Sequence, residues 1–330
     1  MKGAAFTFDF LAQKEGAANN GPSNPLTGQN GADSAVPKET VKSFAWVENI
    51  ESRILNAFDS GWALYQYEEV PLSGEAYVRS VRESISSRKE LQGTDLVPGI
   101  YEGGLKVWEC SIDLCRYLVE NDIDIEGHVL ELGCGQGLPG CCMLKRIAER
   151  LSSGDQEKTS LVGGTAPFGV VFSDYNEFVL TDVTIPNIAL NVRDSLERTR
   201  LQSLSQYVTM GFGDWNAMSE QLLSKSSACP PNIPQDGLFD MILAAETTYS
   251  SQAASDTAFL LAKHLKVNTG VAFIATKRYY FGVGGGSGSF NAALSSVSLP
   301  NVEFNVETLM VFDNGAGNIR ELLKVHATAV

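Results

Sequence analysis

The sequence predicts an α/β fold, a parallel sheet covered by helices on both faces and preceded by an N-terminal extension. From residue 128 onwards, short apolar strands alternate with helical patterns, which is typical of a parallel sheet. One strand runs directly into a glycine turn, and a helical pattern follows that turn. The chain has 330 residues, 44% of them hydrophobic, which suffices for one large domain. We therefore expect a tail over 1–42, an extension over 43–98 and the α/β domain over 99–330.

The region before the α/β domain contains a polar, glycine-rich tail and a more apolar extension. Residues 12–40 are rich in Gly, Asn, Ala, Ser and Pro, so after a short Phe-rich start at 6–10 we expect the tail to be largely disordered. Residues 46–67 mix aromatic and aliphatic side chains, which favours extended pieces that cover the domain. The charged stretch 77–91 indicates a weak helix.

Seven strands are expected in the domain. Apolar residues first recur at helical spacing over 105–119, just before the glycine turn. The strands follow at 128–132, 170–174, 207–212, 238–245, 270–276, 302–309 and 320–327. The helices between them are expected at 138–147, 179–196 with a kink at Pro186, from 219, at 253–266, and after a glycine-rich loop at 282–288.

The glycine turn itself indicates a ligand. Gly133, Gly135 and Gly137 remove the Cβ atoms that would keep a ligand from the backbone. Glu131 stands two residues before the first glycine, and Pro139 suits the first turn of the next helix. This Glu-x-Gly-x-Gly-x-Gly pattern differs from the Gly-x-Gly-x-x-Gly of dinucleotide enzymes and resembles motif I of S-adenosylmethionine-dependent methyltransferases. A dinucleotide site and a glycine turn without a ligand are the alternatives.

Composition excludes other classes of function. A net charge of −14 argues against a surface for duplex nucleic acid. An acidic surface can attract a basic protein partner, with a merely soluble surface as the alternative. The six cysteines show no paired CxxC spacing and there are three histidines, so we expect no metal site and reduced thiols in the cytoplasm, the nucleus or both. Without a run of 18 apolar residues we expect no membrane span, and Asp9 interrupts any signal peptide. We expect a monomer.

Polar and aromatic residues follow the ends of the second and third strands. Asp174 ends the second strand, where a carboxylate suits the two hydroxyls of a ribose, with a helix N-cap as the alternative. Tyr175 and Asn176 come next and are expected to border the adenosine. Asp214 and Trp215 end the third strand, where the carboxylate could accept from the adenine amino group while the indole stacks on the base. Trp215 as plain core filler stays the alternative.

The methyl donor and its acceptor are expected to meet after the central strand, at Ala245 and Glu246. Glu246 is a general base, an orienting acceptor or a plain loop residue, and Tyr249 is expected to wall the acceptor pocket. The aromatic and glycine-rich segment 279–286 predicts a lid or a peptide clamp, with a flexible surface connection as the alternative. Its expected substrate contacts are Tyr280, Phe281 and Gly282.

Six motifs occur in one order along the chain. They are Tyr-Glu-Gly-Gly-Leu-Lys-Val-Trp-Glu-Cys at 101–110, Leu-Glu-Leu-Gly-Cys-Gly at 130–135, Ser-Asp-Tyr-Asn at 173–176, Gly-Asp-Trp at 213–215, Ala-Glu-Thr-Thr-Tyr at 245–249 and Tyr-Phe-Gly-Val-Gly-Gly-Gly at 280–286. Together they resemble the histidine protein methyltransferases, a branch of the seven-strand methyltransferase-like enzymes, over residues 96–327 and at the Phe-rich start. The first and last motifs are much more specific than the glycine motif.

The resemblance implies a Rossmann-like seven-stranded methyltransferase sheet that binds S-adenosylmethionine and releases S-adenosylhomocysteine. It implies a basic protein substrate, a large-subunit ribosomal protein methylated on the tele nitrogen of a histidine. The implied cofactor site consists of Val107, Trp108, Glu109, Cys110, Ser111, Gly133, Gly135, Ser173, Asp174, Tyr175, Gly213, Asp214, Trp215 and Ala245. The chain departs from the pattern at Ala245, where relatives are expected to have serine, and by a long insertion at 152–167.

The acceptor type is left open by the motifs. A neutral imidazole, with a reference pKa of ~6.5, is nucleophilic near neutral pH but needs a hydrogen-bond acceptor for its other N–H. Glu246 is the first candidate for that role, and Asn176 or a backbone carbonyl the second. The run 246–249 also resembles the acid-x-x-Tyr signature of lysine methyltransferases, whose acceptor, with a pKa of ~10.4, must first lose a proton. A cofactor-binding ribosome-assembly factor without turnover is the third reading, and the intact motifs disfavour it.

Overall fold

The chain divides into two units, residues 1–41 and 42–330, and the described residues belong to the second. The computed structural model describes residues 43–60, 65–82, 96–97, 100–124, 127–153, 168–224, 229–230, 232–313, 315 and 317–330. The disorder expected over 12–40, the Phe-rich start and most of the 152–167 insertion therefore lie outside the described residues. Within the described ranges, no helix is long and apolar enough to cross a membrane.

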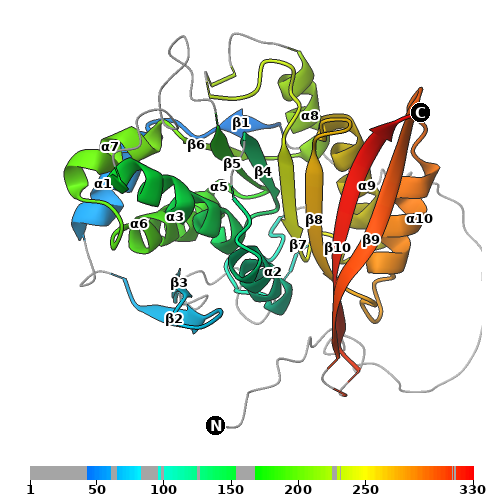
Figure 1. The fold of residues 1–330 in the computed structure, drawn as a ribbon, viewed down its shortest axis with the longest axis horizontal. Coiled ribbons are helices and arrows are strands. Elements are labelled where there is room, and N and C mark those ends of the chain that lie inside the picture. Colours follow the sequence, from blue (N-terminus) through cyan, green and yellow to red (C-terminus); the bar gives the residue numbers. More distant parts are fainter. Residues whose placement is uncertain are drawn as a thin grey trace, which may run out of the picture. The chain divides into compact units, whose positions relative to one another are not determined.

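The main sheet has its strands in the order β1-β6-β5-β4-β7-β8-β10-β9 (Figure 1). They are β1 (Ala45–Trp46), β4 (His128–Leu132), β5 (Gly169–Asp174), β6 (Val208–Phe212), β7 (Met241–Ala245), β8 (Val271–Lys277), β9 (Val302–Asp313) and β10 (Ile319–Ala329). Strands β4 to β8 are parallel to one another, whereas β10 is antiparallel to both β8 and β9. All seven predicted strands are present, so the predicted α/β sheet is confirmed.

The sequence missed one strand, because β1 comes from the N-terminal extension and adds to the edge of the sheet beside β6. Its two residues pair antiparallel with Phe212 and Gly211. A two-residue strand is too short to produce an alternating pattern. The sheet therefore has eight strands, and the expected number of seven was one short.

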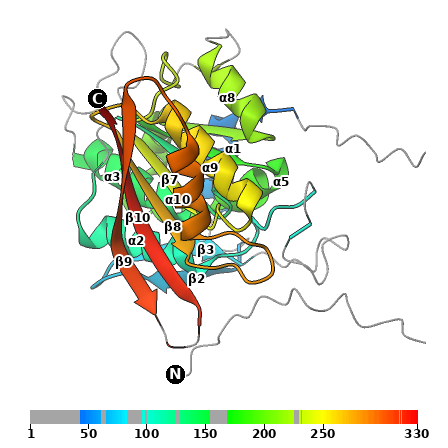
Figure 2. The same ribbon diagram turned by 90° about the vertical axis from the view of Figure 1, so that its right-hand side faces the viewer.

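Helices cover both faces of this sheet, as predicted. One layer consists of α1 (Ile50–Ser60), α2 (Glu109–Glu120), α3 (Leu138–Ser153), α6 (Ile185–Val192) and α7 (Arg198–Ser205). The other consists of α8 (Trp215–Leu223), α9 (Ser251–His264) and α10 (Ser287–Ser296), which lie together in Figure 2. Each layer buries its own apolar cluster against the sheet, and this burial is the main force that holds the layers together.

Two expectations for the extension were wrong in part, and residues 83–91 lie outside the described residues. Within 46–67 the structure has Trp46 and Tyr67 in strands, as expected, but between them the helix α1, whose Ile54 and Ala57 pack into the core three residues apart. Within 77–91 it has the strand β3 (Tyr77–Val81), which forms a hairpin with β2 (Tyr67–Pro71). Tertiary contacts override the local charge pattern there, because side chains of α6 bind the backbone of β3 and hold it extended.

The kink predicted at Pro186 takes the form of a π-helical turn. A short helix α5 (Glu177–Val179) leads into the π turn η3 (Leu180–Thr184), and Pro186 lies in the first turn of α6, where its missing N–H is tolerated. The hydroxyl of Thr184 donates to the carbonyl oxygen of Gly135 over 2.7 Å. The π turn thus holds the glycine turn in place through this hydrogen bond.

Candidate active site

The predicted site residues meet at one edge of the sheet because they follow parallel strands. Neighbouring strands β6, β5, β4, β7 and β8 all run in the same direction, so their carboxyl ends share that edge. Gly213, Asp174, Gly133, Glu246 and Lys277 lie at or directly after these ends. The sheet topology therefore brings together segments that lie up to 144 residues apart in the printed sequence, from 133 to 277.

The glycine turn after β4 has the backbone that only glycine adopts easily. Gly133, Gly135 and Gly137 have φ angles of 54°, 51° and 67°. A Cβ on Gly133 would lie 3.1 Å from the methyl group of Thr247 and 3.5 Å from the ring of Trp215. The bare backbone of Gly133 thus lies against these two side chains from β7 and β6 loops.

The acid of the glycine motif has a structural task. Oε2 of Glu131 accepts the N–H of Gly140 over 2.8 Å, which satisfies one of the free donors in the first turn of α3. Burial raises the pKa of Glu131 well above its usual range. A Cβ on Gly140 would come within 2.4 Å of the same carboxylate oxygen. Glu131 and Gly140 together fix the start of the helix that follows the turn.

Asp174 holds the glycine turn as well as ending β5. Its two oxygens accept the N–H groups of Gly135 and Asn176, each over 3.0 Å, and the side chain is buried. The ribose contact stays a prediction and would use the remaining lone pairs of the carboxylate. Asn176 is also buried, and its amide donates to the carbonyl of Ile100 over 2.7 Å while its oxygen accepts the N–H of Glu102. Asn176 therefore positions the segment that contains Glu102.

Two residues after β6 have different tasks: Asp214 caps a helix, and the ring of Trp215 lies beside the glycine turn. Oδ1 of Asp214 accepts the N–H groups of Asn216 and Ala217 over 2.9 and 3.0 Å, so it caps α8. Trp215 is the first residue of that helix, is half-buried and lies against Gly133. The proposed contacts of Asp214 and Trp215 with adenine stay predictions.

The other predicted cofactor residues lie around the same edge. Trp108 donates from Nε1 to the carbonyl of Gly103 over 3.0 Å and precedes α2. Glu109 accepts from Asn318 over 2.8 Å and pairs with Arg320 at 3.3 Å. Other placements are Val107 packed against the core, Cys110 buried, Ser111 in the first turn of α2, Ser173 buried with its hydroxyl on the carbonyl of Glu131, Tyr175 half-buried after β5, Gly213 bonded to the carbonyl of Asp174, and Ala245 at the end of β7.

Glu246 has the most unusual environment at this edge. It directly follows β7 with a φ of 59°, a left-handed conformation that costs a non-glycine residue about 1–2 kcal/mol. Its side chain is only 8% exposed, and Oε2 accepts the hydroxyl of Tyr280. Oε1 is buried, and among the described residues no hydrogen-bond partner reaches it. Nζ of Lys277 lies 3.7 Å from Oε1.

Tyr249 is paired with a residue that the sequence reasoning missed. Its hydroxyl donates to the carboxylate of Glu102, and burial together with the charge of Glu102 raises the pKa of Tyr249 well above its usual value. Glu102 belongs to the Tyr-Glu-Gly-Gly motif, so its place in that motif was the available signal. Thr247 and Lys277 were missed as well. Thr247 lies inside the Ala-Glu-Thr-Thr-Tyr motif, which was its available signal, whereas no local pattern marks Lys277.

The segment 279–286 is anchored by its glycines. Gly286 donates to the carbonyl of Thr248 over 2.8 Å, and a Cβ on Gly285 would lie 2.2 Å from the same oxygen. Tyr280 points inward to Glu246, whereas Phe281 is 77% exposed. A Cβ on Gly282 would meet nothing within 4 Å. The predicted substrate contacts thus have one ring inside the site and one ring in solvent.

Two buried polar atoms at this edge have no hydrogen-bond partner in the part of the chain that the structure describes, and they test whether a ligand fits. Thr247 is 4% exposed, and its hydroxyl, like Oε1 of Glu246, has no hydrogen-bond partner among the described residues. A buried polar group without a partner normally costs about 1–3 kcal/mol and calls for an explanation. Thr247 lies beside the backbone of Gly133, and Glu246 directly follows the end of β7. The site therefore fits a ligand with polar groups, such as S-adenosylmethionine.

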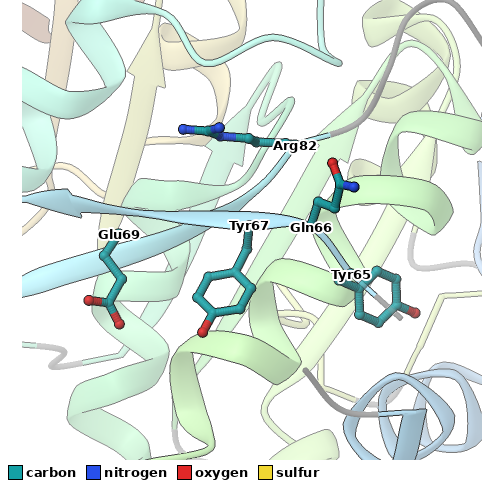
Figure 3. Close-up of a pocket in the computed structure, with 5 residues that line it drawn as sticks. All are labelled: Tyr65, Gln66, Tyr67, Glu69 and Arg82. Atoms are coloured by element: carbon teal, nitrogen blue, oxygen red, sulfur yellow. The ribbon is translucent and has the colours of Figure 1, made fainter. Parts of the chain in front are cut away.

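A separate hollow of about 650 Å³ lies on the β2–β3 hairpin (Figure 3). It is lined by Tyr65, Gln66, Tyr67, Glu69 and Arg82. None of these residues lies at the carboxyl ends of the parallel strands, where the predicted site residues meet. The hollow is therefore distinct from the candidate active site.

The strand order, the antiparallel pair at its end and the glycine turn after the first parallel strand define a Rossmann-like methyltransferase fold. No model of a known protein family matches the chain. A TehB-like S-adenosylmethionine-dependent methyltransferase from Corynebacterium glutamicum matches 66% of this chain and 87% of its own, at 17% identity and a TM-score of 0.34. The topology, and not this remote likeness, carries the fold assignment.

Sequence relatives are more specific. The histidine protein methyltransferase 1 homologue of Dictyostelium discoideum is 35% identical over 239 residues, 72% of this chain and 62% of the relative. That of Rattus norvegicus is 32% identical over 71% of this chain and 59% of its own, and histidine protein methyltransferase 1 of Schizosaccharomyces pombe is 31% identical over 65% and 63%. The chain spans about three fifths of the length of these curated relatives. It is homologous to the histidine protein methyltransferases, which confirms the resemblance of its motifs.

Proposed function

We propose that the protein is an S-adenosylmethionine-dependent protein-histidine N-methyltransferase that methylates the tele nitrogen of a histidine in a large-subunit ribosomal protein. The names of its homologues support the histidine acceptor. The cluster at the carboxyl edge of the sheet supports the cofactor, and the net charge of −14 supports a basic substrate. We further propose that it works as a monomer in the cytoplasm, the nucleus or both.

The observation that carries this proposal is the buried Oε1 of Glu246 without a hydrogen-bond partner among the described residues. A neutral imidazole has one N–H and one bare nitrogen. If the N–H donates to Oε1, the tautomer is fixed and the bare nitrogen becomes the nucleophile. Tyr280 supports this task, because its hydroxyl donates to Oε2 and holds the carboxylate in one orientation.

The cofactor is held, in this proposal, by the backbone around Gly133, the ring of Trp215, the hydroxyl of Thr247 and the carboxylate of Asp174. When bound, S-adenosylmethionine supplies a methyl group that its sulfonium already activates. The protein therefore has to align the acceptor more than activate it, and alignment of this kind supplies a large part of a rate enhancement.

In this proposal, segment 279–286 moves to admit the acceptor to Glu246. Oε1 is buried and Tyr280 of this segment is only 8% exposed, so the acceptor ring reaches Oε1 before the hydroxyl of Tyr280 returns to Oε2. Gly282, Gly284 and Gly286 have φ angles of 83°, 80° and 120°, and glycines give such a segment its backbone freedom. In this proposal the exposed Phe281 contacts the substrate chain beside the acceptor.

The Glu246→Gln variant tests the proposal. It keeps the size of the side chain but removes the charge, so we expect kcat to fall by roughly a hundredfold or more while the Kd of S-adenosylmethionine stays within about twofold. Glu303→Gln is a matched control, because Glu303 is exposed on β9 and loses the same charge. Full activity of Glu246→Gln would refute the role of Glu246, and methyl-lysine as the product would refute the histidine acceptor.

A further inference from the structure

Lys277 places a positive charge beside the carboxylate that is proposed to hold the acceptor. It is the last residue of β8, and its Nζ lies 3.7 Å from Oε1 of Glu246. The two side chains are 14% and 8% exposed. Nζ also lies 5.6 Å from the ring centre of Trp108 and 5.4 Å from that of Tyr280, so two aromatic faces stabilise its charge at this place.

The distance between Nζ and Oε1 is too long for a hydrogen bond but short enough for a strong Coulomb interaction. Hydrogen bonds between nitrogen and oxygen are about 2.7–3.2 Å long, so at 3.7 Å Lys277 does not use a lone pair of Oε1. A Coulomb interaction falls off only slowly with distance and is strong where water is excluded. Lys277 therefore acts on this position through its charge, and Oε1 stays able to accept an N–H.

We propose that Lys277 determines acceptor specificity by admitting a neutral imidazole and repelling a cation. This inference rests on the proposed function of the same site. A lysine ammonium or an imidazolium would have to approach Oε1 within reach of Nζ, and like charges at such a distance disfavour the charged form. A neutral imidazole meets no such penalty and still finds its acceptor. The same charge keeps the bound histidine in its nucleophilic, unprotonated form.

Other charged and titratable groups lie around Lys277, and those described here do not cancel the effect of its charge on Oε1. Burial and then the charge of Glu246 raise the pKa of Cys110 well above its usual value, while the charge of Lys277 acts in the opposite direction. Arg320 is the cross-strand neighbour of Lys277 on β10. Its charge is met by Asp113 and Glu109. Two further groups among the described residues are Tyr280, whose hydroxyl binds Glu246, and Lys106, a second cation that lies over Trp108.

The test measures kcat against pH, since kcat reports groups in the complex with substrate. Large-subunit ribosomal proteins serve as acceptors, labelled S-adenosylmethionine is saturating, and methyl-histidine is counted after hydrolysis. The variants are Lys277→Met, which removes the charge at similar length, and Lys277→Arg, which keeps it. Lys263→Met is the control, because Lys263 is an exposed lysine on α9. Thermal melting and cofactor affinity confirm first that each variant is folded.

In Lys277→Met the midpoint of the acidic limb should move up by about one pH unit or more, as expected when a nearby like charge is removed. Lys277→Arg and Lys263→Met should keep the midpoint of the unmodified protein. An unchanged midpoint in Lys277→Met overturns the inference, and so does an equal shift in Lys277→Arg or a loss of activity at every pH. Methyl-lysine, or no methylated product, from the unmodified protein refutes the proposed function instead.

Discussion

The hydroxyl of Thr247 offers a prediction in which stability and cofactor affinity change in opposite directions. Thr247 is 4% exposed, and its Oγ1 is buried without a hydrogen-bond partner among the described residues. Its methyl group lies against Gly133 at the glycine turn. Thr247→Val keeps the shape of the side chain and replaces the hydroxyl by a methyl group.

The magnitudes follow from the burial of this group. A buried hydroxyl without a partner costs about 1–3 kcal/mol, so its removal should raise the free energy of unfolding of the cofactor-free protein by up to that amount. If the hydroxyl binds the cofactor, the variant loses one neutral hydrogen bond, worth about 0.5–1.5 kcal/mol. The Kd of S-adenosylmethionine should then rise by roughly two- to tenfold.

Denaturant unfolding and calorimetric titration of the two proteins measure these quantities. Thr257→Val is the matched control, since Thr257 is buried and its hydroxyl donates to the carbonyls of Ala253 and Thr247 over 2.8 and 3.2 Å. That control should lose about 0.5–1.5 kcal/mol of stability, because a satisfied hydrogen bond is removed. The reasoning is refuted if Thr247→Val destabilises the free protein, or if it stabilises the protein and leaves the Kd unchanged.

Three further predictions concern the cofactor site, the tail and the acid of the glycine motif. Asp174→Ala and Trp215→Ala should each weaken S-adenosylmethionine, for Asp174 by roughly tenfold to a hundredfold if a charge-assisted pair is lost; unchanged affinity by calorimetry in folded variants would remove these residues from the site. Deleting residues 12–40 should leave the melting temperature within about a few degrees, given their composition, and a large drop in a thermal melt would contradict this. Burial raises the folded-state pKa of Glu131, so its stabilising effect is present below its unfolded pKa of ~4.3 and is lost as the pH rises toward the folded value. Glu131→Gln should therefore gain stability relative to the unmodified protein as the pH rises above about 4.3, and a pH-independent difference in urea unfolding would contradict the assignment.

The positions of the strands along the chain were predictable because their signal is local and repeated. Apolar runs such as 128–132 and 241–245 are buried on both faces and stand out against polar connections. The extension was harder, because β3 owes its conformation to hydrogen bonds with the side chains of Asn187 and Asn191, more than 100 residues away. Nothing within residues 77–91 records those partners.

In the candidate active site, too, local motifs were predictable from the sequence, but long-range contacts were not. Motifs placed Glu246 and Tyr280 at the carboxyl edge of the sheet, but the hydroxyl–carboxylate pair between them depends on two separate loops. The roles of Thr247 and Lys277 depend on partners that only the folded chain brings near them. A Cβ on Gly133 would lie 3.1 Å from the methyl group of Thr247, and Nζ of Lys277 lies 3.7 Å from Oε1 of Glu246. Asp214 was expected on adenine, and the structure shows it as the N-cap of α8, a role that the sequence reasoning did not assign to it. Its adenine contact stays a prediction.

Methyl transfer into large-subunit ribosomal proteins tests the central claim most directly. The purified protein is incubated with labelled S-adenosylmethionine and these acceptors, and the labelled product is hydrolysed and separated as amino acids. The account predicts tele-methylhistidine, formed at a rate that rises through about pH 6–7 and then levels off, since the acceptor must be unprotonated. Label recovered only as methyl-lysine, with a rate that still increases well above pH 8, would contradict it.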